Sequence, residues 1–197
     1  MWDLFKFILF VLLIPFVGAA VVNFYDHLAV LPNGFQHELI LGAYIFALVF
    51  IFLHKLEPIY EFGQNIVLKC FQFASPVNKA ISCFFPFYTF LICIAFVVLN
   101  RFFKNENFNA IGFYIFGFTL LMHVVLTAQQ VQNGEKPIWK PNYYFSMSCY
   151  LITLTLVCAL FLDLILLKFQ FPSFLTHLYL LTKKYYIWTV KKILLLK

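Results

Sequence analysis

Five long apolar runs, separated by short polar connections, are the feature that most constrains this chain. They cover about residues 4–22, 39–53, 84–99, 108–127 and 143–167. Runs of about 20 apolar residues cross membranes as helices, because lipid offers no water to satisfy an exposed backbone. The chain is 63% hydrophobic and 11% charged, whereas soluble domains carry about 25% charged residues. The sequence therefore predicts an all-α integral membrane protein and excludes a soluble globular domain.

A sixth membrane segment is predicted over residues 59–74, although this stretch is polar. Lys and Arg accumulate on the cytoplasmic side of membrane proteins. Five crossings divide the basic residues eight to six, whereas a sixth gives ten inside and three outside. The sixth crossing also places both termini in the cytoplasm and the Asp26-His27 loop outside. A helix lying in the membrane interface is the alternative. The polar residues that neighbouring helices are expected to shield are Glu61, Gln64, Asn65 and Lys69.

Residues 1–172 are predicted to form the transmembrane domain, and residues 173–197 a basic amphipathic helix on the membrane surface. His177, Lys184 and Lys191 recur every seven residues, with apolar side chains largely on the other side. Anionic lipids of a cytoplasmic leaflet attract such a face, each Lys contributing about 1 kcal/mol. An acidic protein partner is the alternative, and nucleic acid is not expected to bind. The predicted lipid-binding residues are Lys183, Lys184, Lys191 and Lys192.

Two ionisable residues, His123 and Asp163, stand inside otherwise apolar runs. An ionisable residue within a membrane is a candidate for function, although polar contacts between helices are an equally physical role. The two residues are expected near opposite membrane surfaces, so they should not pair with each other. A polar path through Glu61, Lys69, His123 and Asp163 would suit a small transporter or channel subunit.

The pair His37-Glu38 begins like the HExxH zinc motif, but Leu41 occupies the position of the second histidine. We interpret the pair as interfacial, with Glu38 in the first turn of its helix. The five cysteines are odd in number and show no C-x-x-C spacing, so we predict free thiols. No metal and no cofactor is predicted. An enzyme with a divergent metal site that uses His37, Glu38 or His123 is a third possibility.

Several segments between about residues 55 and 167 resemble uncharacterised bacterial membrane proteins distantly related to site-2-type intramembrane zinc metalloproteases. The Phe62-Gly63 pair stands where those proteins carry Phe-Gly before HExxH. The aromatic and proline-containing run 84–89 resembles a following helix, and residues 117–127 resemble a later one. The resemblance implies a fold with a zinc helix near residue 64.

The same resemblance implies that the zinc chemistry is lost. It places Gln64 at the first ligand position, Asn65 at the general-base position and Leu68 at the second ligand position. Zinc hydrolysis needs imidazoles to hold the metal and a carboxylate to activate its water. The Asn-Pro-Asp-Gly motif of the third ligand is absent as well. A catalytically inactive relative is therefore implied.

Together these features favour a non-catalytic protein of the bacterial cytoplasmic (inner) membrane, a scaffold or a subunit of a membrane complex. Other membrane subunits or further copies of the chain would cover its polar helix, and lipids would surround the rest. The alternatives are a small transporter or channel subunit and a divergent membrane metalloprotease.

Overall fold

The computed structural model describes residues 2–29, 35–53, 56–74, 78–102, 106–134, 141–166 and 170–195. Every regular element among these residues is helical, which confirms the predicted all-α class. Some basic residues of the charge count lie outside the described ranges, namely Lys55, Lys104, Lys136, Lys140, Lys168 and Lys197. The helices are α1 (Trp2–Ala29), α2 (Phe35–Phe52), α3 (Glu57–Cys70), α4 (Asn78–Phe84), α5 (Phe87–Asn100), α6 (Glu106–Gly134), α7 (Pro141–Leu166) and α8 (Phe171–Leu195), with a 3-10 turn at Gln72–Ala74.

The chain forms two compact units. The first unit is Met1–Val30 with Val131–Lys197, and the second is Leu31–Gln130. Helices α1, α7 and α8 therefore belong to one unit, while α2 to α5 and most of α6 form the other. The predicted boundary after residue 172 stays a prediction.

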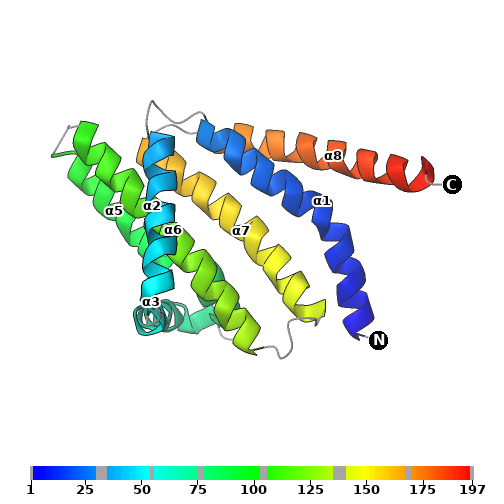
Figure 1. Cartoon of the computed structure of the whole chain (residues 1–197), viewed down its shortest axis with the longest axis horizontal. Helices are drawn as coiled ribbons and strands as arrows, with labels where there is room; N and C mark the ends of the chain where they lie inside the picture. The colour runs from blue at the N-terminus through cyan, green and yellow to red at the C-terminus, as the bar shows by residue number, and fades with distance from the viewer. Residues whose placement is uncertain are drawn as a thin grey trace. The chain divides into compact units, whose positions relative to one another are not determined.

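In the first unit, α1 and α7 run parallel to each other (Figure 1). The ring of Phe10 lies 5.2 Å from that of Tyr144, and further along both helices His27 contacts Asp163. Small side chains allow this close approach, as is usual between membrane helices. The buried core of the unit consists of Ala19, Ala20, Ala159, Phe174 and Leu178.

Helix α8 runs antiparallel to α1. Its beginning contacts Asn23 through Phe174, and further along the hydroxyl of Tyr186 donates to the carbonyl of Leu12. On the apolar side of this helix, Leu178 belongs to the protein core, and Leu181 and Tyr185 pack against that core. The predicted C-terminal helix therefore forms, but its place at the membrane surface is not confirmed.

Helix α1 is longer than the predicted run, which ended at residue 22. It continues to Ala29, so Asp26 and His27 lie on a helix and not in a loop. Asn23 and His27, four residues apart on this extension, hold it against α8 and α7. These tertiary contacts explain why the helix extends beyond its apolar segment.

In the second unit, α2 and α6 run parallel and touch through their backbones. Phe35 stacks on Phe113 at 4.7 Å, and further along Phe46 meets Phe118 at 5.2 Å between ring centroids. A Cβ atom added to Gly42 would lie 1.9 Å from the carbonyl oxygen of Tyr114. A Cβ added to Gly117 would lie equally close to the carbonyl of Leu39. Only glycine fits at these two positions.

Helix α3 lies across the end of α2, where Figure 1 shows it end-on. A proline in its first turn fits the helix start, because proline lacks the N–H that would be unpaired there. The inner side of α3 buries Tyr60 in a core with Phe46, Met122 and Leu126. The helix of the next predicted run, 84–99, begins at Phe87 as α5, after α4 has ended at Phe84, because the intervening Pro86 cannot donate a helical hydrogen bond.

Four helices among the described residues are long and apolar enough to cross a membrane, while α5 is apolar but shorter. This confirms the predicted membrane class. Helices α3 and α5 both have 14 residues, so each is about 21 Å long at about 1.5 Å per residue, shorter than a hydrocarbon core of about 30 Å. The count of six membrane segments is therefore not confirmed. The four candidate spans are Leu4–Ala29, Phe35–Phe52, Asn109–Gln132 and Tyr143–Leu166.

Candidate functional site

A polar cluster, here called the His27–Asp163 cluster, joins α1, α7 and α8 in the first unit; it consists of Asn23, His27, Asp163 and His177. Asp163 is only 4% exposed, and its Oδ1 atom lies 3.3 Å from Nε2 of His27. Asn23 is also buried, and its amide nitrogen donates to the carbonyl of Phe174 at 3.0 Å. The other amide atom of Asn23, Oδ1, lies 2.6 Å from Nδ1 of His177. One helical turn of α1 therefore contacts both α7, through His27, and α8, through Asn23.

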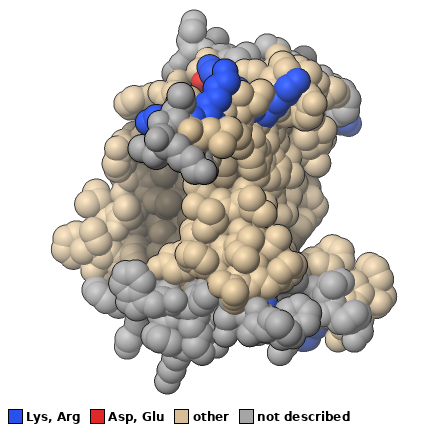
Figure 2. Space-filling view, turned by 90° about the vertical axis from the view of Figure 1, so that its right-hand side faces the viewer, with Lys and Arg blue, Asp and Glu red and all other residues tan. Residues whose placement is uncertain are grey.

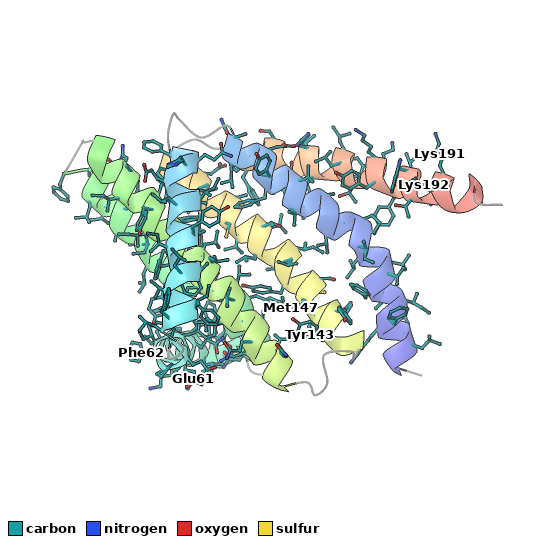
Figure 3. All side chains as sticks on the ribbon, viewed as in Figure 1. Glu61, Phe62, Tyr143, Met147, Lys191 and Lys192 are labelled. Carbon is teal, nitrogen blue, oxygen red and sulfur yellow. The ribbon has the colours of Figure 1, made fainter. Side chains whose placement is uncertain are left out.

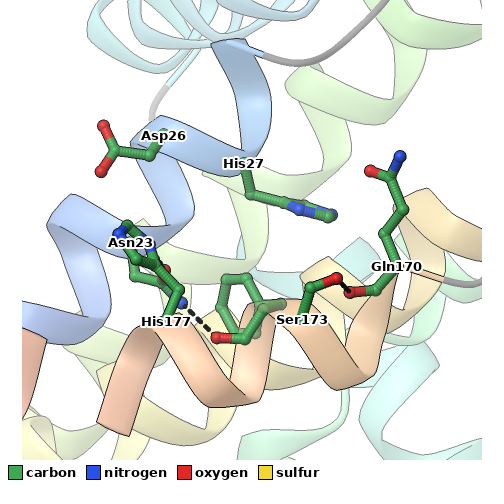
Figure 4. Close-up of a pocket in the computed structure, with 7 residues that line it drawn as sticks. Asn23, Asp26, His27, Gln170, Ser173 and His177 are labelled. Carbon is green, nitrogen blue, oxygen red and sulfur yellow. Dashed lines mark hydrogen bonds between the residues drawn. The ribbon is translucent and has the colours of Figure 1, made fainter. Parts of the chain in front are cut away.

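The cluster borders a cavity of about 250 Å³. Figure 4 shows His27 and Asp26 projecting from different sides of α1, with His27 directed toward Gln170. Both imidazoles, those of His27 and His177, line this cavity, and Asp163 lies behind His27. The arrangement places one imidazole against a buried carboxyl group and a second imidazole at the exposed side of the cavity.

A second polar cluster, the Tyr60 cluster, lies in the other unit and comprises Tyr60, Gln64, His123 and Thr127. The hydroxyl of Tyr60 hydrogen-bonds the hydroxyl of Thr127, and the Gln64 amide donates to it at 2.8 Å. The rings of Tyr60 and His123 lie 5.6 Å apart. Burial raises the pKa of Tyr60, and its hydrogen bond to Thr127 only partly opposes this shift. The phenol is therefore held neutral as a hydrogen-bonding group.

Cys83 on α4 borders this cluster. His123 hydrogen-bonds the backbone of Cys83, and burial raises the pKa of the Cys83 thiol. A raised pKa keeps the sulfur as a poorly nucleophilic thiol. The prediction that all five cysteines are free is confirmed.

The outer face of α3, defined by Glu61, Asn65 and Lys69, is exposed along two helical turns. Glu61 and its neighbour Phe62 point away from the other helices (Figure 3). Gln64 alone among the four predicted polar residues of this helix turns inward and is half-buried. The chain itself therefore covers Gln64 and leaves the other three uncovered.

The four predicted lipid-binding lysines of α8 are all exposed: Lys183, Lys184, Lys191 and Lys192. The ammonium group of Lys192 lies 4.5 Å from the centre of the Trp188 ring. Figure 2 shows Lys and Arg side chains mainly at the level of α8, above a broad surface without charged residues. No acidic residue occurs within α8 to neutralise these lysines.

The structure brings some of the predicted residues together and separates others. His123 meets Gln64 through Tyr60, whereas Asp163 belongs to the first unit and contacts His27. Both residues link helices, as expected of polar groups in a bundle. Sequence reasoning placed His27 in a loop and His177 on the basic face of the C-terminal helix, and it did not connect either residue with Asn23. The four-residue spacing of Asn23 and His27 was a signal that these two share a helix face. Glu38 lies in the first turn of α2, as predicted.

The positions that the protease resemblance assigns to zinc chemistry do not converge. Gln64 bonds Tyr60, Asn65 is exposed, and Leu68 has no donor atom. Among the described residues no group of three or more His, Cys, Asp or Glu side chains is placed to hold a metal ion. Comparison with protein families, with curated proteins and with solved structures finds no match to this chain.

Proposed function

We propose that this protein is a non-catalytic subunit or scaffold of a membrane complex that binds a partner through the outer face of α3. The observation that supports this proposal most strongly is that α3 has one side packed against the protein and one side exposed. Its inner side is fixed by Tyr60 and Gln64, while Glu61, Asn65 and Lys69 stand uncovered at intervals of four residues. A rigid helix with spaced hydrogen-bonding groups is suited to recognise another polypeptide.

The direction of the helices in the second unit supports a surface position for α3. Because α2 and α6 run parallel, the chain must cross the membrane an odd number of times between them. Helices α3 and α5 are the two long helices in that interval, so one of them crosses and the other does not. Since α5 is apolar and α3 lies across the end of α2, α5 is the better candidate for the crossing.

The direction of the helices in the first unit agrees with this count. Helices α1 and α7 also run parallel, so an odd number of crossings must separate them. Helices α2, α5 and α6 provide three, and a crossing by α3 would make the number even. We therefore propose five crossings, with α3 in the interface.

Five crossings place the N-terminus and the basic α8 on opposite sides of the membrane. The orientation with α8 in the cytoplasm puts eight basic residues inside and six outside, which agrees with the positive-inside tendency. This replaces the earlier expectation that both termini are cytoplasmic. The bacterial inner membrane remains a proposal supported by the family resemblance alone.

The resemblance to site-2-type proteases supports a non-catalytic role in the same way. If α3 derives from a zinc helix, Gln64 now supports the Tyr60 hydroxyl, and the exposed Asn65 takes the place of a catalytic carboxylate. A divergent metalloprotease is the weaker alternative, because Leu68 and the two amides are poor zinc ligands.

The test is purification from native membranes in mild detergent, followed by mass measurement of the complex. We expect a co-purifying chain or an oligomer that is lost in the triple variant Glu61→Ala, Asn65→Ala, Lys69→Ala. His37→Ala, at an exposed position on α2, is the matched control and should retain the complex. A strict monomer without any partner would contradict the proposal.

A small proton-coupled transporter is the second candidate, and the His27–Asp163 cluster is the observation that favours it. A buried carboxylate in contact with an imidazole, next to a cavity, is a recurring arrangement for proton transfer in membranes. Proton flux into proteoliposomes should then be abolished by Asp163→Asn and be unchanged by Glu38→Gln, in the first turn of α2. Equal flux in wild type and Asp163→Asn would exclude this role.

A further inference from the structure

The first unit contains an apolar groove between α1 and α8 with a volume of about 680 Å³. It is bordered on α1 by Val11, Ile14, Pro15 and Gly18, and on α8 by Lys184, Tyr185, Trp188 and Thr189. One end is closed where Tyr185 approaches Gly18. Beyond this contact the two helices diverge, as Figure 1 shows, and the groove lies between the diverging segments.

A basic pocket of about 410 Å³ adjoins the groove along α8. Its lining includes Lys183, Lys184 and Lys191, and it shares Lys184 and Trp188 with the groove. The apolar groove and the basic pocket are thus connected through two side chains. Neither lining contains a carboxylate, so an anion at the lysines meets no repulsion from them.

We propose that these two pockets form one binding site for an anionic phospholipid. One acyl chain occupies the groove between Ile14, Gly18 and Trp188, and the phosphate lies at Lys184 and Lys191. Trp188 stands between the two parts, where its amphipathic ring suits the boundary between chain and headgroup.

Charge complementarity is the reason to choose a lipid over a protein helix as the occupant. A protein helix would need both an apolar face for the groove and acidic side chains spaced to reach the adjoining lysines. An anionic lipid satisfies both at once, because its phosphate and its chain are joined at a fixed distance. A cytoplasmic leaflet, to which the proposed topology assigns α8, supplies such lipids.

The experiment is native mass spectrometry of the protein in mild detergent, titrated with phosphatidylglycerol or with phosphatidylcholine of the same acyl chains. We expect phosphatidylglycerol to bind more tightly. Lys184→Gln with Lys191→Gln should weaken its binding about fivefold for each lysine, the equivalent of about 1 kcal/mol each. Ile14→Trp, or Val11→Trp as a second variant, should fill the groove and weaken both lipids.

The matched controls lie outside both pockets. Arg101→Gln removes an exposed basic side chain of the second unit, and Ile8→Trp enlarges an exposed apolar side chain of α1; neither should change lipid binding. Equal affinity for the two lipids in wild type overturns the proposal. So does displacement of phosphatidylglycerol by glycerol phosphate, which would identify a bare anion site.

A change in oligomer mass on Ile14→Trp with lipid binding intact would also overturn the proposal, because the groove would then hold a protein. The proposal does not rest on partner binding by α3. The two use residues of different units, so either can fail while the other stands.

Discussion

The two units bury polar groups in different ways. The first unit buries a carboxylate against an imidazole, Asp163 with His27, and extends the contact through Asn23 to His177. The second buries neutral groups around the hydroxyl of Tyr60. The helix contacts differ as well, since the backbones of α2 and α6 touch at glycines. The first unit therefore depends on pairing a buried carboxyl group with an imidazole, and the second on shape and hydrogen bonding.

The largest effect is expected from His27→Leu. It leaves the buried Asp163 carboxylate without its cation or proton donor, and removing one partner of a buried pair lowers the free energy of unfolding by about 3–5 kcal/mol. Chemical denaturation in detergent measures the loss. The double variant with Asp163→Leu should recover much of it, and the exposed His37→Leu should lose little. A small loss for His27→Leu alone would mean that the pair carries no charge.

Gly117→Ala should destabilise the second unit by about 3 kcal/mol, near the upper end for overpacking. The new Cβ would lie 1.9 Å from the carbonyl oxygen of Leu39, and backbone yields less easily than a side chain. Gly18→Ala in the first unit is the matched control, because its Cβ would meet the Tyr185 ring at an ordinary 3.7 Å. Thermal unfolding of both variants checks the contrast, and equal midpoints would refute it.

Tyr60→Phe should reduce stability by about 1–2 kcal/mol at neutral pH, because a hydrogen-bonded buried hydroxyl is lost. The pKa of Tyr60 is raised above its ordinary 10.0 by burial, so the unfolded chain releases this proton at lower pH than the folded one. The stabilising effect of the hydroxyl is therefore complete below about pH 10 and declines as pH rises further.

Denaturation at several alkaline pH values tests this sign. The difference in stability between wild type and Tyr60→Phe should shrink as pH rises above 10.0, the ordinary pKa of tyrosine. A difference that grows with pH would show that Tyr60 ionises more easily in the folded protein.

The smallest effect concerns thiol reactivity and leaves stability unchanged. At about pH 8, close to the usual thiol pKa of about 8.5, the exposed Cys70 should be alkylated quickly. Cys83 should react slowly, because burial both shields it and raises its pKa. Mass spectrometry of single-cysteine variants measures the two rates. Comparable rates would mean that the Tyr60 cluster opens to solvent.

Much of the fold could be predicted from hydropathy, because each apolar run must be helical wherever lipid surrounds it. The runs 39–53 and 143–167 coincide closely with α2 and α7. The first run was predicted too short, since hydropathy stops at residue 22 while α1 continues on contacts made by Asn23 and His27. The sixth segment was predicted from charge counts, and the structure does not confirm it, because α3 is short and lies across the end of α2.

The polar clusters were only half visible in the sequence. His123 and Asp163 were found because an ionisable group in an apolar run is conspicuous. Their partners were not, because Tyr60 is ordinary in an aromatic-rich chain and His27 was assigned to a loop. Pairing between residues more than 60 positions apart depends on how the helices pack, and local composition does not record that.

The sequence by itself determined that this chain is an all-α membrane protein with a basic C-terminal segment. These properties follow from transfer free energies that each residue carries wherever it lies. Only the tertiary structure decided that α1 is parallel to α7, that α2 is parallel to α6, and that Asp163 meets His27. The direction and pairing of these helices depend on contacts between distant segments. The absence of a Cβ at Gly117 allows α2 and α6 to approach closely, and the imidazole of His27 pairs α1 with α7.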